Sequence, residues 1–113
     1  MSSYVSILND CAYSLENHWK NAAHLIDDAK KSDAIEKALW SKMPQDVFDG
    51  VELEMLRYAE KLTLRPSSMV QEDVLALKAA GAEDGEILEL NQIVGYFNYV
   101  NRLLNGLGVN DQW

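Results

Sequence analysis

The chain has 113 residues, of which 48% are hydrophobic and 25% are charged, and this size and apolar content predict a single domain over residues 1–113. Ten Lys and Arg against 18 Asp and Glu give a net charge of −8. Because this field repels phosphate backbones and anionic lipid, we expect no nucleic-acid partner and no membrane partner.

The N-terminal segment carries the apolar spacing of a long helix. Its apolar residues recur at alternating steps of three and four: Val5, Leu8, Ala12, Leu15, Trp19, Ala22 and Ile26. This spacing predicts one helix over residues 4–29. The first residues lack the basic region of a signal peptide, and no apolar run reaches the roughly 20 residues of a membrane span, which favours a cytoplasmic protein.

Two shorter elements are predicted next. A short helix is expected around residues 34–40, and a loop over residues 42–50, where Pro44 and Gly50 interrupt the helical pattern. The three-four spacing restarts at Val51 and predicts a helix over residues 51–64.

The end of that helix is predicted by a proline. The residue before Pro66 disfavours helical backbone, so the helix should end before the Arg65-Pro66 pair. Ser67 and Ser68 can then accept hydrogen bonds from the first amides of the next helix.

Glycines bound the last two predicted helices. A short helix over residues 71–80 should stop at Gly81, and a long one should run from near Asp84 to the Asn105-Gly106 pair. The apolar face of the last helix consists of Ile87, Leu90, Val94, Phe97 and Leu104. With residues 108–113 as a loose tail, the sequence predicts an all-α fold of about five helices with long first and last helices.

One polar trio lies on a single stripe of the predicted first helix. At 100° per residue, Cys11, Ser14 and His18 fall within 60° of one another around the axis. Ser14 is one turn from His18, about 6 Å of rise, whereas Cys11 is two turns away, roughly 10.5 Å. The imidazole can therefore reach the hydroxyl rather than the thiol.

The spacing is that of a thiol redox centre that lacks one sulfur. In a helical C-x-x-C-x-x-x-H arrangement, the second sulfur can be held as thiolate beside the imidazole, attack an oxidant and be resolved by the first sulfur. Ser14 occupies the attacking position here, and a hydroxyl forms neither a sulfenic acid nor a disulfide. Because Cys11 is the sole cysteine, the redox cycle cannot close within one chain, and no intrachain disulfide is possible.

These residues carry a resemblance to a known family. The stretch VSILNDCAYSLENH, residues 5–18, resembles the redox core of the alkylhydroperoxidase D-like (AhpD-like), or carboxymuconolactone decarboxylase, family. Residues 56–109 resemble the C-terminal part of its peroxidase-related branch. The redox core and the segment YFNYVNR, residues 96–102, are the most specific parts of the match.

The resemblance implies an all-α AhpD-like domain, homo-oligomerisation through helix faces and peroxide reduction by a Cys pair. Position by position, Cys11 matches the resolving Cys, Ser14 the peroxidatic Cys and His18 a relay His. The relay Glu of the family would fall one residue before Met1, so the pattern departs from the family at Ser14 and at this acid. The resemblance implies a peroxide substrate and an external thiol reductant if the chain is active, and a centre that is weak or inactive as it stands.

Each of these residues also has an ordinary structural interpretation. Cys11 alone is typical of a small buried hydrophobic residue, and His18 of a packed or capping imidazole. A Ser14–His18 hydrolase pair is disfavoured because no carboxylate is evidently placed to orient the imidazole. Two His and one Cys lack the spacing of a closed zinc centre, so we expect neither a metal nor a cofactor. The remaining candidates are most simply exposed, core or interface side chains: Asp10, Glu16, His24, Tyr96, Phe97 and Tyr99.

Three functions remain open. The first is a peroxidase-related antioxidant protein whose thiol centre is degenerate, the second a non-catalytic homo-oligomer that retains the fold, and the third, ranked lowest, a lactone-type or decarboxylase activity. Assembly has separate support from two apolar surfaces: Tyr4, Ile7 and Leu25 add a second stripe to the first helix, and residues 93–104 are apolar over much of the last one. We expect a homo-oligomer, with a dimer, trimer or hexamer all possible.

Overall fold

The computed structural model describes residues 1–9, 35, 37, 38, 40, 42, 43, 45 and 48–108. Its helical elements, in chain order, are α1 (Ser2–Leu8), α4 (Gly50–Leu64), the 3₁₀ helix η2 (Pro66–Ser68), α5 (Gln71–Ala79) and α6 (Asp84–Leu107). No strand occurs in this described part of the chain. The all-α prediction is therefore confirmed.

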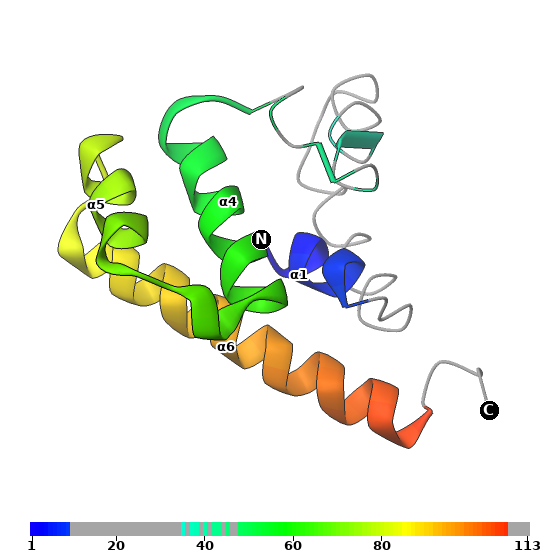
Figure 1. Cartoon of the computed structure of the whole chain (residues 1–113). Coiled ribbons are helices and arrows are strands. Elements are labelled where there is room, and N and C mark those ends of the chain that lie inside the picture. Colours follow the sequence, from blue (N-terminus) through cyan, green and yellow to red (C-terminus); the bar gives the residue numbers. More distant parts are fainter. Residues whose placement is uncertain are drawn as a thin grey trace.

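The other three α-helices all pack against α6, the longest described helix. Helices α1 and α4 pack against α6 and against each other, and α5 packs against α4 and the start of α6. Figure 1 shows α1 and α4 on the same side of α6, with α5 beside its N-terminal half. The first and last described helices, which are distant in sequence, thus lie in contact.

Helix α1 is buried on both of its apolar faces. Val5 joins a cluster with α4, α5 and α6 residues, among them Tyr58, Ala59, Leu77, Leu90 and Val94. Tyr4, Ile7 and Leu8 join Leu56 in a second cluster, against which Ile35 and Phe48 pack. Tyr4 and Ile7 belong to the apolar surface that the sequence offers for assembly, but both are buried inside this chain, at 0% and 3% exposure, and neither is available to a second subunit.

The predicted helix over residues 51–64 is confirmed as α4. It begins at Gly50 and ends at Leu64, and Arg65 leaves the helical region with φ −139° and ψ 60°. Pro66 follows directly, which accounts for the stop. Glu52 lies in the first turn and Lys61 in the last, where each charge suits the helix dipole.

The predicted role of Ser67 and Ser68 is wrong. Both lie in η2 and are exposed, whereas Val70 is the residue that precedes α5. The helix start is stabilised instead by Asp73, whose carboxylate accepts a hydrogen bond of 2.8 Å from the Val70 amide. An acidic residue three positions into the helix satisfies a backbone donor that the serines leave unpaired.

The predicted stop at Gly81 is confirmed. Gly81 has φ +109°, a conformation that disfavours any residue with a Cβ, and the Ala82 amide donates to the Leu77 carbonyl at 3.0 Å. Helix α6 then begins at Asp84, as predicted, and the Glu83 amide donates to the Glu86 side chain at 2.9 Å. Both boundaries follow from local chemistry.

The predicted end of the last helix is too early. Helix α6 continues through Gly106 to Leu107, and Gly108 adopts the left-handed conformation that ends it, with φ 70° and ψ 31°. The Asn105 side chain donates to the backbone of Asn9, the residue after α1, rather than capping its own helix. A tertiary contact thus holds the segment helical past its first glycine.

The prediction of one unbroken helix over residues 4–29 is wrong: α1 ends at Leu8, and Asn9 is a turn residue with φ −94° and ψ 2°. Residues 2–8 are helical, and positions 10–34 lie outside the described residues. Within the predicted short helix over 34–40, the described positions 35, 37, 38 and 40 are all helical. Among the helices that the structure describes, none is long and apolar enough to cross a membrane.

Candidate functional site

The three predicted site residues, Cys11, Ser14 and His18, lie outside the described residues. The last described residue before this trio is Asn9, two positions before Cys11, and the structure shows its hydrogen bonds. The geometry of this anchor shows which parts of the fold position the start of the predicted redox segment.

Asn9 is held through its side chain and its backbone. Its Nδ2 donates to Oδ1 of Asn98 at 2.8 Å, and its carbonyl accepts from Nδ2 of Asn105 at 2.8 Å. Both partners belong to α6. The chain that enters the predicted redox segment is therefore fixed to the last helix at two points, about two turns apart along its axis.

Asn98 connects three helices. Its Nδ2 donates to Thr63 of α4 and to the carbonyl of Val94, both at 2.9 Å, while its Oδ1 accepts from Asn9 and from Arg102, both at 2.8 Å. All hydrogen-bonding positions of this amide are thus occupied. One side chain thus links the end of α1 to α4 and α6, just before the predicted redox segment.

A second contact between α1 and α6 is fully buried. The Ser6 hydroxyl donates to Oδ1 of Asn101 at 3.3 Å, and both residues are 0% exposed. Nδ2 of Asn101 and Oδ1 of Asn105 are buried without a hydrogen-bond partner among the described residues. This face of α6 therefore carries buried polar atoms as well as its apolar contacts.

We call Ser6, Asn9, Thr63, Asn98, Asn101 and Asn105 the asparagine network. Sequence reasoning missed it, although a pattern was available: three asparagines recur at steps of three and four, which places them on one stripe of a helix that is otherwise apolar there. Two of them, Asn98 and Asn101, fall in the YFNYVNR segment. Its aromatic residues take different positions: Phe97 packs on the core, whereas Tyr96 and Tyr99 are exposed.

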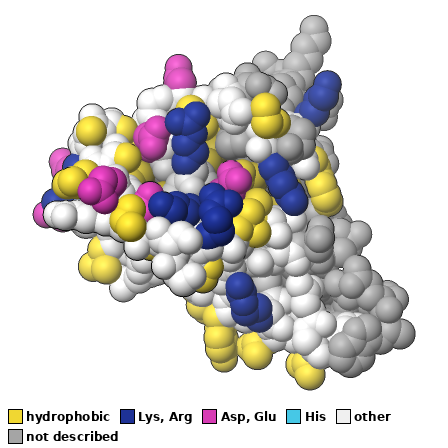
Figure 2. Space-filling model, in the orientation of Figure 1, with side chains coloured by type: hydrophobic (Ala, Val, Ile, Leu, Met, Phe, Trp, Pro, Cys, Tyr) yellow, Lys and Arg dark blue, Asp and Glu magenta, His cyan; other side chains and the backbone are white. Residues whose placement is uncertain are grey.

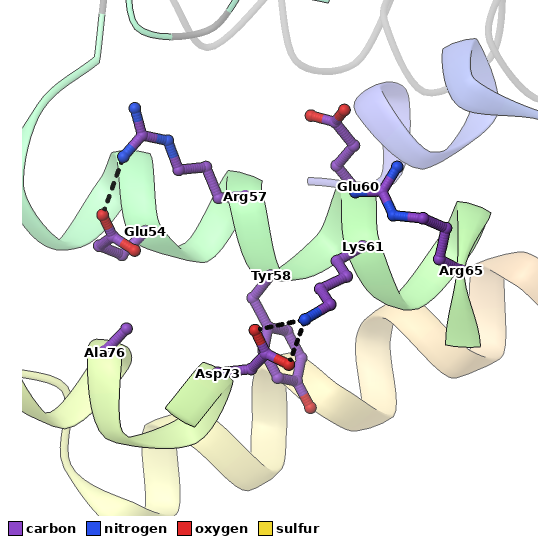
Figure 3. Close-up of a pocket in the computed structure, with 8 residues that line it drawn as sticks. All are labelled: Glu54, Arg57, Tyr58, Glu60, Lys61, Arg65, Asp73 and Ala76. Atoms are coloured by element: carbon purple, nitrogen blue, oxygen red, sulfur yellow. Dashed lines mark hydrogen bonds and ion pairs between the residues drawn. The ribbon is translucent and has the colours of Figure 1, made fainter. Parts of the chain in front are cut away.

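A separate cleft lies on the other side of α4, between α4 and α5 (Figure 3). It has a volume of about 290 Å³ and is lined by Glu54, Arg57, Tyr58, Glu60, Lys61, Arg65, Asp73 and Ala76. Figure 2 shows Lys and Arg side chains gathered at the centre of this face, with acidic side chains beside them. None of the predicted site residues lines it.

Charges in the cleft pair with one another. Nζ of Lys61 lies 2.8 Å from Oδ2 of Asp73 and bridges α4 to α5, and Arg57 pairs with Glu54 at 3.2 Å within α4. The hydrogen bond from Lys61, followed by that from the Val70 amide, lowers the pKa of Asp73 below its usual value. Figure 3 shows Lys61 and Asp73 pointing toward each other across the cleft.

Tyr4 links the cleft to α1. Its hydroxyl donates to Oε2 of Glu60 at 3.0 Å. Burial, followed by the charge and hydrogen bond of Glu60, raises the pKa of Tyr4 well above its ordinary value, so the phenol stays protonated as a donor.

The cleft is a poor candidate for a reaction centre. Among the described residues it offers three basic and three acidic side chains but no Ser, Thr, Cys or His, and its volume lies just below the range of ligand pockets, about 300–1,000 Å³. Within the described ranges, no group of three His, Cys, Asp or Glu side chains could hold a metal ion. The cleft therefore does not replace Cys11, Ser14 and His18 as the predicted site.

The comparisons with known proteins bear on the fold of the chain. No family model and no curated protein matches the sequence. A solved structure does match: an uncharacterized peroxidase-related protein from Silicibacter sp. TM1040, with 25% sequence identity and a TM-score of 0.78 over 93% of this chain. The match covers 53% of that protein, so this chain spans about half of its length. The chain thus has the all-α fold of a peroxidase-related protein.

Proposed function

We propose that this chain is a peroxidase-related protein of the AhpD-like, or carboxymuconolactone decarboxylase, type, with a degenerate thiol centre made of Cys11, Ser14 and His18. As it stands, Cys11 acts at most as a lone thiol that reacts with a peroxide and depends on an external thiol for its reduction. That dependence suits a reducing compartment such as the cytoplasm.

The observation that carries the proposal is the agreement between fold and motif. The similar solved structure is a peroxidase-related protein, and residues 5–18 of this chain keep the C-x-x-x-x-x-x-H spacing of a thiol centre with one sulfur replaced. Support also comes from α6, because the YFNYVNR segment supplies Asn98, which binds Asn9 just before the motif.

The chemistry that Cys11 can perform alone is limited. Its thiolate attacks the terminal oxygen of a hydroperoxide, a sulfur–oxygen bond forms and the oxygen–oxygen bond breaks; the departing alkoxide takes a proton from water and leaves as the alcohol. Cys11 is oxidised to a sulfenic acid. One external thiol then condenses with it, releasing water, and a second external thiol cleaves the mixed disulfide and restores Cys11. Both steps need a reductant that can reach this segment.

Ser14→Cys tests the proposal directly. If residues 11–18 form a helix, as their sequence pattern predicts, a sulfur at position 14 is one turn from His18 and can be resolved by Cys11 as a disulfide, which closes the cycle within one chain. We expect higher peroxide consumption in the presence of dithiothreitol than for the unchanged chain. In the Ser14→Cys background, His18→Ala should reduce the rate by about 10²-fold, the usual contribution of a positioned acid or base.

Ser67→Cys is the matched control, because it adds a second thiol at an exposed serine of η2, far from the motif in sequence. The proposal fails if Ser14→Cys leaves peroxide consumption unchanged, or if Ser67→Cys raises it equally. Mass spectrometry of the unchanged chain after peroxide treatment adds a second readout: an unmodified Cys11 identifies it as an inert packed residue.

A non-catalytic role in assembly is the second candidate, and one observation favours it. The outward side of α6 exposes several large apolar side chains, among them Tyr96, Tyr99 and Leu107 at 60%, 61% and 72%. Such a surface serves association whether or not the thiol centre is active.

A further inference from the structure

The outward face of α6 carries a continuous row of exposed residues. We call it the outer stripe; its members are Leu88, Gln92, Tyr96, Tyr99, Leu103 and Leu107. The five apolar members are between 49% and 72% exposed. They follow one another at steps of three and four, so they form one ridge along nearly the whole helix, opposite the face that packs on α1 and α4.

The outer stripe contains no charged side chain. A quarter of the chain is charged, and a solvated helix face normally holds much of that charge. Gly95 and Gly106 lie beside the stripe, and a Cβ at either position would meet nothing within 4 Å. Another helix can therefore approach the backbone closely along this ridge. Figure 2 shows hydrophobic side chains projecting at the lower edge of the molecule, where α6 runs in Figure 1.

The order of the stripe residues is nearly the same in both directions. Their intervals are four, four, three, four and four residues, symmetric about the midpoint between Phe97 and Asn98. Two antiparallel copies of α6 centred there bring Leu88 against Leu107, Gln92 against Leu103 and Tyr96 against Tyr99 of the other copy. A two-fold interface requires this self-complementarity, whereas an unrelated partner does not.

The exposed area suits a dimer of this kind. Five half-exposed apolar side chains, two of them aromatic, offer on the order of 500 Å² per chain, at the upper end of what monomers leave uncovered. With flanking contacts, this approaches the roughly 800 Å² per partner of a standard interface.

We propose that the outer stripe of α6 is a two-fold interface at which a second copy of this chain binds, with the two α6 helices antiparallel. This inference goes beyond the proposed thiol chemistry and does not depend on it. The inner face of α6 positions Asn9, and the outer face joins two chains.

Tyr99→Glu tests the interface, because it places a charge at the centre of the stripe, where the side chain is exposed and folding does not require it. Sedimentation velocity of the 113-residue chain over a micromolar range gives the dissociation constant. We expect a dimer for the unchanged chain and a weakening on the order of thirtyfold for Tyr99→Glu, as for a central interface residue. Leu75→Glu on α5 is the matched control, because Leu75 is 48% exposed but lies off the stripe; it should leave the constant unchanged.

A charge exchange tests the antiparallel register. In the double variant Tyr96→Lys with Tyr99→Glu, the antiparallel arrangement places Lys against Glu of the other copy, so association should recover relative to Tyr99→Glu alone. A parallel arrangement places like charges together and weakens association further, which overturns the antiparallel register.

Three outcomes overturn the interface itself: a monomeric unchanged chain, a dimer insensitive to Tyr99→Glu, or equal weakening by Leu75→Glu. Far-ultraviolet circular dichroism of each variant verifies that the helices are retained.

Discussion

Asn98 illustrates how one polar side chain can position a segment that is distant in sequence. Four hydrogen bonds of 2.8 or 2.9 Å join its amide to α1, α4 and α6 residues. The helical period of the sequence predicted α6 but not this function, because an asparagine in an apolar stripe can equally be a tolerated polar residue. Its partners, Asn9 and Thr63, are separated from it by 89 and 35 positions, and no local pattern specifies such pairs.

Asn98→Ala should destabilise the fold by about 2 kcal/mol, because it leaves part-buried donors and acceptors on Asn9 and Thr63 unpaired. Urea denaturation at one fixed protein concentration measures the loss. Glu89→Ala, at an exposed position of the same helix, should stay within about 0.5 kcal/mol of the unchanged chain. An equal effect of the two substitutions would mean that the network contributes nothing beyond helix propensity.

Asp73 joins α5 to α4 through its charge. Because its pKa is lowered in the folded state, the carboxylate favours folding above the ordinary pKa of about 3.9, and this contribution is lost as the pH falls through the lower folded value. Asp73→Asn should therefore lower the urea midpoint at pH 7 and have progressively less effect below about pH 4. Glu72→Gln, at the exposed acid beside it, controls for general charge. A difference between Asp73→Asn and the unchanged chain that stays constant with pH would refute the linkage.

At the scale of elements, boundaries set by local chemistry were predictable. Pro66 stops α4 and Gly81 stops α5, as expected from backbone preferences alone. The end of α6 was not predicted correctly. Either Gly106 or Gly108 could end the helix, and the helix ends at the later glycine, where Asn105 also contacts Asn9. The serines after Pro66 were assigned a capping role that Asp73 performs, since either residue type can satisfy an amide.

Gly81→Ala should destabilise the molecule by about 1–2 kcal/mol, because φ +109° is strained for a residue with a Cβ although space is open around it. Gly85→Ala, in the first turn of α6, should instead stabilise by about 0.5–1 kcal/mol, because the backbone there is helical and the Cβ position is equally open. Thermal unfolding of the pair measures both effects. Shifts of the same sign would contradict the assignment of strain to Gly81.

At the scale of the whole molecule, the pattern of apolar residues did not reveal which faces are internal. The sequence predicted a second apolar stripe on the first helix as part of the surface available for assembly, but Tyr4 and Ile7 of that stripe pack with Leu56 within this chain. Periodicity identifies a face that must be covered and not the element that covers it. The last helix shows the complementary case, since its inner face is covered by α1 and α4 while its outer stripe is exposed.

The net charge of −8 makes a prediction for the proposed dimer as a whole. Two chains that each carry this charge repel one another. The outer stripe itself is uncharged, so burial of its apolar side chains favours the dimer while the net charge opposes it. Raising the salt concentration shortens the screening length from about 10 Å at 0.1 M to a few ångströms near 1 M, which weakens the repulsion and leaves the apolar contact intact. Sedimentation velocity should therefore report a smaller dissociation constant at 0.5 M than at 0.05 M sodium chloride. An interface formed instead by ion pairs, such as those of the α4–α5 cleft, would show the opposite trend.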